Sequence, residues 1–389
     1  MLRVLTLSSL FPDASRPNFG VFVERQTLGL AAHPDVALTV VAPLGVPPWP
    51  LSRHRHYRAF ADLPEREVWK GVEVLRPRFT VLPGTGGRYH VAAMQRAVWR
   101  AIAGRAFDVI DASFFFPDGP VAAGLGWELD LPVSIKARGA DIHHWGHARA
   151  TAAQVVEAGE AADGLLAVSR AMRDDMAAIG IPAEKIRVHH TGVDLARFVP
   201  VDRTAAKAAL GVSGPLVVSV GALIARKGHD VVIDTMARLD GVTLLIAGEG
   251  EARPALETRI ARLGLGERVR LLGSVPHGEL PALIAAADVM ALASSSEGLA
   301  NAWVEALACG TPIVITPAGG AEEVVTAPEA GRIVPREAGA FAAAIGELLA
   351  APPPAEAVRA HALGFTWEAN TASLYDHLAG LVAARQARG

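Results

Sequence analysis

Two carboxylates eight residues apart are the strongest candidates for site chemistry in this chain of 389 residues. Glu297 lies in a polar stretch after a predicted strand, and Glu305 lies in a predicted helix that begins near Asn301. The backbone N–H groups of Leu299, Ala300 and Asn301 would point out of the start of that helix, where an anion is favoured. We therefore expect both carboxylates to face one ligand from different depths.

Two adjacent cations supply the opposite charge. Arg226 and Lys227 follow a predicted strand and Gly221, an arrangement that suits an anionic group such as a diphosphate. The stretch resembles a nucleotide-binding P-loop, but Arg226 replaces its second glycine and Gly228 replaces its Mg²⁺-binding Ser or Thr, which disfavours an ATPase. Carboxylates and cations together predict a ligand with hydroxyls and phosphates, and a nucleotide sugar has that character.

Three other motifs are incomplete. The Gly248–Gly250 turn follows a strand, but Arg253 stands where a dinucleotide site needs its third glycine. Ser169 lies where a hydrolase nucleophile would be, but alanines replace both flanking glycines, so a helix N-cap is favoured. His143 and His147 could share a helical face as zinc ligands, but no acidic or cysteine ligand is close in sequence.

The elements that must position these residues alternate between short apolar runs and Ala/Leu-rich helical patterns. Continuous apolar strands separated by helices predict parallel sheets covered on both faces, an α/β fold. A break near residues 195–214 divides the chain into two doubly wound domains, whose strand ends should line a cleft. Strands are expected at residues 3–7, 38–42, 72–76, 109–111, 133–137, 165–168, 216–220, 242–247, 269–272, 289–292 and 313–316.

Composition excludes several classes of protein. With 51% hydrophobic and 20% charged residues the chain is not disordered, and a net charge of −3 disfavours a nucleic-acid partner. The single cysteine, Cys309, cannot form an internal disulfide, which fits a reducing compartment. The N-terminal apolar stretch is broken at Pro12 and Asp13, so it predicts a strand rather than a signal peptide. We expect a cytoplasmic protein without a transmembrane helix.

Seven motifs in register resemble the retaining GT-B glycosyltransferases of glycosyltransferase family 4, also called glycosyl transferases group 1. They are NFGVFVER at 18–25, RGAD at 138–141, TGVD at 191–194 with Phe198, GALIARKG at 221–228, IAGEG at 246–250, the E-x7-E motif at 297–305 and GGAEE at 319–323. The resemblance implies a Rossmann-like acceptor domain at 1–198 and a Rossmann-like nucleotide-sugar domain at 199–366. It also implies that residues 367–389 form a helix that packs back on the first domain.

The resemblance assigns roles to the candidate residues. Arg226 and Lys227 would hold the donor diphosphate, Glu305 would bind the ribose hydroxyls, and Glu297 would lie by the transferred sugar. Neither a metal nor a permanently bound cofactor is implied, because the cations and the helix dipole would neutralise charge on the leaving diphosphate. Further donor contacts are implied for Gly20, Val275, Leu299, Ala300 and Asn301.

The chain departs from the family at Arg138, where many relatives have histidine. An arginine, with a pKa above about 12, cannot act as a base. We therefore expect Arg138 to bind an anionic acceptor, with Asp141 or His143 assisting. The expected catalytic set is Glu297, Arg226, Lys227 and Asp141.

The acceptor side also has a basic segment. Residues 51–105 hold eleven Arg or Lys and four acids, a net charge of +7, with interleaved aromatic residues. This composition suits an anionic leaflet or a polyprenyl-diphosphate acceptor, whereas solvated arginines around core aromatics are the plainer alternative. The segment predicts a peripheral contact with the inner face of the membrane.

The lead function is transfer of a sugar from a UDP- or GDP-linked donor, retaining its anomeric configuration, to a lipid-linked intermediate of a bacterial surface polysaccharide or exopolysaccharide. Three alternatives stay open at this point. The acceptor could be a soluble small molecule or a lipid headgroup. The chain could instead be a nucleotide-sugar epimerase of the same fold, or a binding module without activity.

Overall fold

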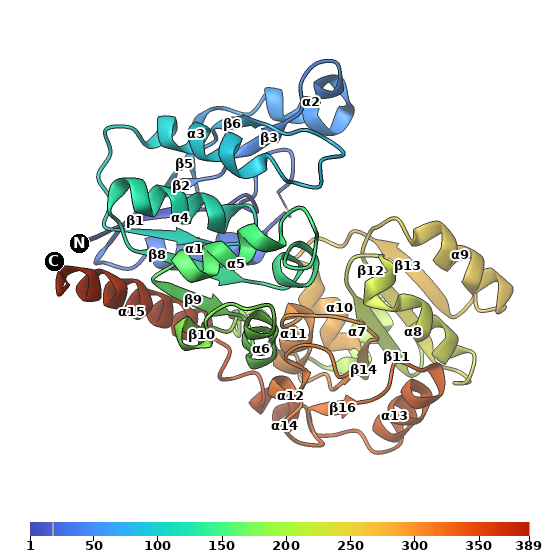
Figure 1. Ribbon diagram of the computed structural model, residues 1–389. Helices are drawn as coiled ribbons and strands as arrows, with labels where there is room; N and C mark the ends of the chain where they lie inside the picture. The colour runs from blue at the N-terminus through green and yellow to red at the C-terminus, as the bar shows by residue number, and fades with distance from the viewer. Residues whose placement is uncertain (18, 389) are drawn as a thin grey trace. The chain divides into compact units, whose positions relative to one another are not determined.

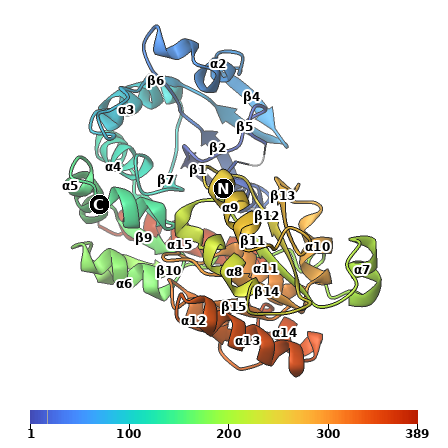
Figure 2. The same ribbon diagram turned by 90° about the vertical axis from the view of Figure 1, so that its right-hand side faces the viewer.

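The computed structural model describes residues 1–17 and 19–388, without the side chains of residues 55 and 56. Asn18, the first residue of the 18–25 motif, lies outside the described residues. The chain forms two compact units, an N-terminal unit of Met1–Thr191 with Trp367–Gly389 and a C-terminal unit of Gly192–Thr366. Each unit has its own parallel sheet, whose strands can be followed in Figures 1 and 2.

The N-terminal unit contains an eight-stranded sheet in the order β10-β9-β8-β7-β1-β2-β5-β4. Its strands are parallel except β4, which pairs antiparallel with β5. A separate parallel pair is formed by β3 (Leu44–Val46) and β6 (Arg78–Thr80). The strands of the main sheet are β1 (Leu2–Leu7), β2 (Val36–Val41), β4 (Arg66–Trp69), β5 (Val72–Leu75), β7 (Val109–Ala112), β8 (Val133–Ala137), β9 (Gly164–Ala167) and β10 (Ile186–Val188).

The helices of this unit include the last helix of the chain. Leu374 and Leu378 of α15 are fully buried against Val4 and Leu30, so the predicted return of the final helix to the N-terminal unit is confirmed. The helices and single turns are α1 (Val21–Ala31), η1 (Leu51–Arg53), α2 (Arg55–Ala61), α3 (His90–Ile102), α4 (Asp118–Leu129), η2 (Asp141–Trp145), α5 (Ala152–Ala161), α6 (Arg170–Ala178), η3 (Ala183–Lys185) and α15 (Trp367–Gln386).

The C-terminal unit contains a six-stranded parallel sheet in the order β13-β12-β11-β14-β15-β16. Its strands are β11 (Leu216–Val220), β12 (Thr243–Ala247), β13 (Val269–Gly273), β14 (Val289–Leu292), β15 (Ile313–Ile315) and β16 (Gly331–Ile333). Its helices are α7 (Arg203–Ala209), η4 (Ala225–Lys227), α8 (His229–Met236), α9 (Arg253–Arg262), α10 (Leu280–Ala286), α11 (Asn301–Ala308), α12 (Ala321–Val324), α13 (Ala338–Ala350) and α14 (Ala355–Ala360).

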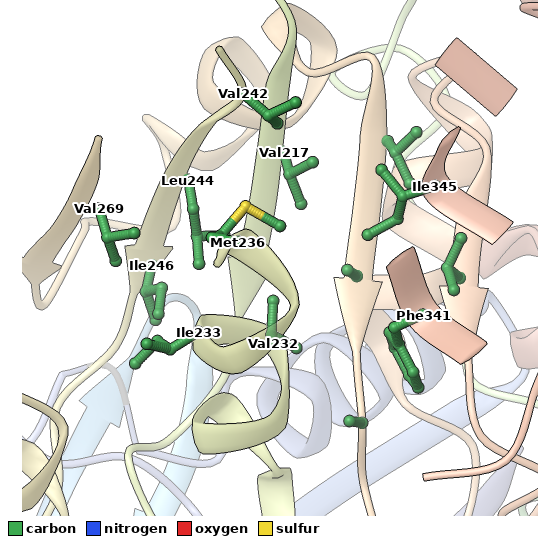
Figure 3. Packing of buried hydrophobic residues seen from close by; sticks show 14 of the residues in the cluster. Val217, Val232, Ile233, Met236, Val242, Leu244, Ile246, Val269, Phe341 and Ile345 are labelled. Carbon is green, nitrogen blue, oxygen red and sulfur yellow. The ribbon is translucent and has the colours of Figure 1, made fainter. Parts of the chain in front are cut away.

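Alternate residues of β11 and β12 pack on opposite faces of this sheet. Val217 and Leu244 face α8 and α13 in one core cluster, as Figure 3 shows. Leu216, Val218 and Leu245 belong to a second cluster with residues of α10. Both faces of the strands are therefore buried, which is why their sequences are apolar without alternation.

All eleven predicted strands are present, with ends that differ by at most two residues. Among the described residues, five further strands, β3, β4, β6, β10 and β16, were not predicted. Each has only three or four residues and includes Arg or Gly, so no continuous apolar run marks it in the sequence. Among the described residues, no helix combines the length and the apolar character needed to span a membrane.

Gly228 joins η4 to α8 where the chain passes close to the end of β14. Its φ is +69°, and an added Cβ would lie 1.9 Å from the backbone oxygen of Ala293. Gly241 has nearly the same φ, +70°, but an added Cβ there would meet nothing within 4 Å. An alanine at Gly241 would therefore suffer backbone strain alone, whereas an alanine at Gly228 would suffer the same strain and a steric overlap as well.

We expect Gly228→Ala to lower the free energy of unfolding by about 3 kcal/mol or more, because left-handed strain and overpacking add there. Gly241→Ala, the matched control, should cost about 1 kcal/mol from strain alone. Urea unfolding of the two variants measures the difference. Equal losses would show that Ala293 moves away without cost.

Candidate functional site

The carboxylate of Glu297 joins the loops that follow β11 and β14. These strands are neighbours in the sheet, so their loops leave its edge side by side. The Lys227 ammonium lies 2.5 Å from Oε1 of Glu297, and the Ser294 hydroxyl donates to the same oxygen at 2.6 Å. Arg226 Nη1 lies 3.4 Å from Oε2. The predicted cations and the first predicted carboxylate are therefore together in one cluster.

The cluster is only partly open to solvent. Glu297 is 6% exposed, whereas the side chain of Arg226 is 39% exposed. Arg226 also donates from Nη1 to the Ser296 oxygen, and the Ser295 amide donates to the Arg226 oxygen at 2.8 Å. These bonds join the two loops, and part of the Arg226 side chain remains exposed.

The start of α11 provides a second group of donors beside Glu297. The helix begins at Asn301 as predicted, and no side chain caps its first turn at Ala300. Leu299 and Ala300 are buried, and the Gly320 amide donates to the Gly298 oxygen at 2.8 Å. The first amides of this eight-residue helix thus follow a fixed loop, an arrangement that favours a bound anion.

Glu305 is 4% exposed and lies in the second turn of α11. His277 Nε2 lies 3.1 Å from Oε1 of Glu305, and the His277 ring packs edge-on against Phe198. The sequence reasoning missed His277, although it lies two residues after Val275, which it had singled out. Val275 itself is partly buried against the core below the sheet.

In the N-terminal unit, Asp141 holds the turn that follows β8. It is fully buried, and its oxygens accept the backbone amides of Gly139 at 2.7 Å, Arg138 at 3.0 Å and Phe115 at 3.1 Å. Burial raises the pKa of this carboxyl above its ordinary value. These contacts describe a group that orients the turn, and its catalytic assistance stays a prediction.

The same turn fixes Arg138. Its Nε donates to the Ser113 oxygen at 2.7 Å, and its Nη2 donates to Gln26 Oε1 at 3.2 Å. Burial lowers the pKa of Arg138 to about 10, so the guanidinium remains charged at neutral pH. Gln26 was not predicted, since a single glutamine in an amphipathic helix carries no pattern of its own.

A buried network continues below Arg138. Lys136 donates to Gln26 Oε1 at 2.8 Å, and its Nζ lies 2.7 Å from His189 Nδ1. Burial lowers the pKa of Lys136 well below its ordinary value and also lowers the pKa of His189. His189 Nε2 donates to the backbone oxygen of Asn370 in α15 at 2.9 Å, which ties the last helix to this network.

The predicted histidines lie close to the same turn. His143 is in η2, a short π-helical turn, and its Nε2 lies 2.8 Å from Asp175 Oδ2 on α6. His147 follows η2 rather than sharing a regular helical face with His143. Within the described parts of the chain, no group of three or more His, Cys, Asp or Glu side chains is placed to hold a metal ion.

The predicted helix cap at Ser169 and the predicted donor contact of Gly20 have different outcomes. Ser169 caps α6, because its hydroxyl accepts the Met172 amide at 3.0 Å, and the predicted N-cap is confirmed. Gly20 precedes α1 with a φ of +64°, and an added Cβ would lie 1.6 Å from the Leu10 oxygen. Gly20 is therefore required by the path of its own loop, and its donor contact stays a prediction.

The basic segment 51–105 combines buried and exposed side chains. Phe60 and Phe79 are buried, whereas Trp49, next to the segment, is 73% exposed. Several of its cations are in ion pairs, such as Arg76 with Glu67 at 2.5 Å. The side chain of Arg55, one of the eleven cations, lies outside the described residues.

Two family models match the chain in sequence. One, described as Glycosyltransferase Family 4, matches residues 29–197, and one described as Glycosyl transferases group 1 matches residues 202–363. Together they cover most of both units. The chain therefore belongs to the group 1 and family 4 glycosyltransferases, which are transferase enzymes.

Curated relatives agree with this family over part of their length. The D-inositol 3-phosphate glycosyltransferases of Mycobacterium tuberculosis and Mycobacterium bovis are 40% identical to the chain over 209 residues. The match covers 50% of this chain and 44% of each relative, so the chain spans less than half the length of these proteins.

Solved structures show the same fold. Sucrose-phosphate synthase from Thermosynechococcus elongatus superposes with a TM-score of 0.81 over 99% of this chain and all of its own, at 21% identity. HepE of Anabaena, solved in complex with UDP and glucose, has a TM-score of 0.76 over 98% of this chain and all of its own, also at 21% identity. At this identity the likeness establishes the GT-B fold.

The buried carboxyl of Asp118 predicts a pH dependence of stability. Its Oδ2 accepts the Ser9 amide at 2.9 Å, and burial raises its pKa to about 7. The folded state then binds more protons than the unfolded state between about pH 4 and pH 7, so the free energy of unfolding falls as pH rises through this window. Asp118→Asn should keep the acceptor for Ser9 and flatten this fall.

Urea midpoints at pH 5 and pH 8 measure the effect. Asp108→Asn is the control: hydrogen bonding to Arg3 lowers the pKa of Asp108, so its contribution is fully present at both pH values and its loss should lower stability equally at pH 5 and pH 8. If wild type and Asp118→Asn lose stability equally between pH 5 and pH 8, this carboxyl does not titrate in that range.

Proposed function

We propose that this chain transfers a sugar from a nucleoside-diphosphate sugar to an anionic acceptor, with the donor in the C-terminal unit and the acceptor in the N-terminal unit. The observation that carries the proposal is the cluster around Glu297. Arg226 and Lys227 meet one buried carboxylate beside the uncapped start of α11, and Glu305 lies further along that helix. This arrangement matches a ligand with a diphosphate at one end and hydroxyls at the other.

Donor recognition divides between the two ends of this cluster. Arg226 and Lys227 bind the diphosphate and, with the first amides of α11, neutralise the charge that develops on the leaving group. These groups supply the positive charge that a divalent metal would otherwise provide, so the transfer is metal-independent. Glu305 accepts hydrogen bonds from the ribose hydroxyls, and its contact with His277 keeps the carboxylate in position.

The transfer retains the anomeric configuration by attack on the face from which the diphosphate leaves. Oε1 of Glu297 already accepts from both Lys227 and Ser294, which reduces its strength as a covalent nucleophile. Glu297 therefore orients the sugar and stabilises the positive charge that develops on its ring. The donor base is uridine or guanosine, and the neighbour HepE, solved with UDP-glucose, supports uridine.

On the acceptor side, Arg138 binds an anionic group, Asp141 positions it through the turn, and His143 assists. We propose a polyprenyl-diphosphate-linked intermediate of bacterial surface polysaccharide synthesis as the acceptor, reached from the cytoplasmic face by peripheral contact of residues 51–105. The second candidate is a soluble anionic polyol, which the names of the inositol-phosphate relatives favour.

A panel of nucleotide sugars, assayed for diphosphate release with and without each acceptor, distinguishes the two candidate acceptors. Donor hydrolysis without dependence on any acceptor would contradict transfer.

Arg226→Ala and Lys227→Ala should each lower turnover by about 100-fold or more, the scale of losing one preorganised charge contact to the leaving group. Steady-state release of nucleoside diphosphate measures the loss. Arg262→Ala, which removes an exposed cation from α9 of the same unit, is the matched control and should leave turnover unchanged. Near-normal rates in both test variants would refute the diphosphate assignment.

Glu305→Gln tests the ribose contact separately. The amide keeps the size of the side chain but loses one acceptor and the charge that His277 faces, so we expect UDP affinity to fall about tenfold, the scale of a hydrogen bond to a charged group. Isothermal titration with UDP and with inorganic diphosphate measures this. The affinity for inorganic diphosphate should stay constant, and an equal loss for both ligands would place Glu305 at the phosphates instead.

A further inference from the structure

A pocket of about 800 Å³ lies in the N-terminal unit, and most of the residues that line it belong to the basic segment 51–105. It is formed by the parallel pair β3 and β6 together with η1 and α2, which lie near one another in Figure 1. Its lining consists of Val46, Pro47, Pro48, Ser52, Arg53, Tyr57, Arg58, Ala61, Arg78, Phe79 and Thr80.

The pocket is held in shape by packing and hydrogen bonds below it. Leu44, Phe60 and Leu63 form a small buried cluster that fastens α2 to β3. Arg78 Nη2 donates to the Phe60 oxygen at 3.1 Å and also to the Leu63 oxygen, so the end of α2 is tied to β6. The walls are therefore fixed parts of the fold.

The charge around this pocket is positive. Arg53, Arg58 and Arg78 line it, and no carboxylate does. Glu65 lies 3.8 Å from Arg78, but its side chain is 87% exposed. Among the described residues, neither Arg53 nor Arg58 forms an ion pair. Two guanidinium groups are thus available for an anion, and arginine matches a phosphate with paired N–H donors.

The lining also contains a group of apolar side chains. Val46, Pro47, Pro48 and Phe79 line one part of the pocket, and the neighbouring Trp49 is 73% exposed. An exposed tryptophan beside arginines is typical of a surface that meets both an apolar chain and a polar head. A free inorganic anion would use only the arginines.

We propose that this pocket binds the phosphate or diphosphate of an amphiphile, with its hydrocarbon chain along the wall of Val46, Pro47 and Pro48. The assignment rests on the proposed function only for the source of the amphiphile, which is either the lipid-linked acceptor or an anionic phospholipid of the membrane. In both cases Arg53 and Arg58 recognise the same chemistry. The site is separate from Arg138, which is fixed by the turn after β8.

Binding of geranyl diphosphate to the full chain, measured by isothermal titration with the donor site saturated with UDP, tests the pocket. Arg53→Ala/Arg58→Ala should weaken binding at least about tenfold, the scale of losing a charge-assisted hydrogen bond. Ala61→Trp, which fills the pocket without changing charge, should weaken it as well. Arg238→Ala/Arg262→Ala removes the same charge from exposed positions of the C-terminal unit and should not.

The controls separate this site from the donor site. UDP affinity should be unchanged in the pocket variants, so a failed donor assignment and a failed pocket give different results. Inorganic diphosphate should bind more weakly than geranyl diphosphate, because it makes no contact with the apolar wall. Equal affinity for both probes, or unaltered geranyl diphosphate binding in both pocket variants, would overturn the proposal.

Vesicles identify the source of the amphiphile. If vesicles of anionic phosphatidylglycerol displace geranyl diphosphate and those of zwitterionic phosphatidylcholine do not, the pocket binds a membrane headgroup. If neither displaces it while a polyprenyl-diphosphate-linked sugar does, the pocket binds the acceptor. Displacement by both kinds of vesicle alike would contradict recognition of the anionic phosphate.

Discussion

The buried carboxylate of Glu297 is the interaction on which the C-terminal unit's candidate site depends. It places one negative charge between Arg226 and Lys227, which would otherwise repel each other at the same strand ends. A buried charge left without its partner is costly, so the loss of Lys227, the nearer cation at 2.5 Å, would destabilise the Glu297 carboxylate more than the loss of the more exposed Arg226. A diphosphate bound as proposed would compete with Glu297 for the same donors, so the contacts that shape the loops would also be those that recognise the ligand.

In the N-terminal unit, a neutral side chain rather than a carboxylate holds two basic side chains together. Gln26 accepts from both Arg138 and Lys136, and burial disfavours the charged form of Lys136. His189 links this network to the backbone of Asn370, with the proton on Nε2. The last helix therefore does more than cover apolar surface, because its backbone fixes the tautomer of a histidine in the network below the turn that follows β8.

The fold was largely predictable, because strands buried on both faces must be apolar throughout, and eleven such runs were visible. Five short strands were not, since Arg or Gly interrupts each of them and no continuous apolar run is left. Arg226, Lys227, Glu297 and Glu305 could be singled out as candidates because strand-end loops and a helix start have local sequence signals. His277 and Gln26 could not, since their partners lie 28 and 112 positions away and neither belongs to a local pattern.

Net charge is a poor measure of what the N-terminal unit offers a ligand. Residues 51–105 have a net charge of +7, but Glu73 pairs with both Arg66 and Arg105, and Arg76 is buried against Glu67. These pairs hold the edge of the sheet, and their charges largely cancel at a distance. Among the described residues, the cations that form no ion pair include Arg53 and Arg58 of the pocket formed by β3, β6, η1 and α2. Salt screens the field of such charges beyond about 10 Å. The binding proposed for the pocket therefore depends on contact geometry inside it rather than on attraction across the whole segment.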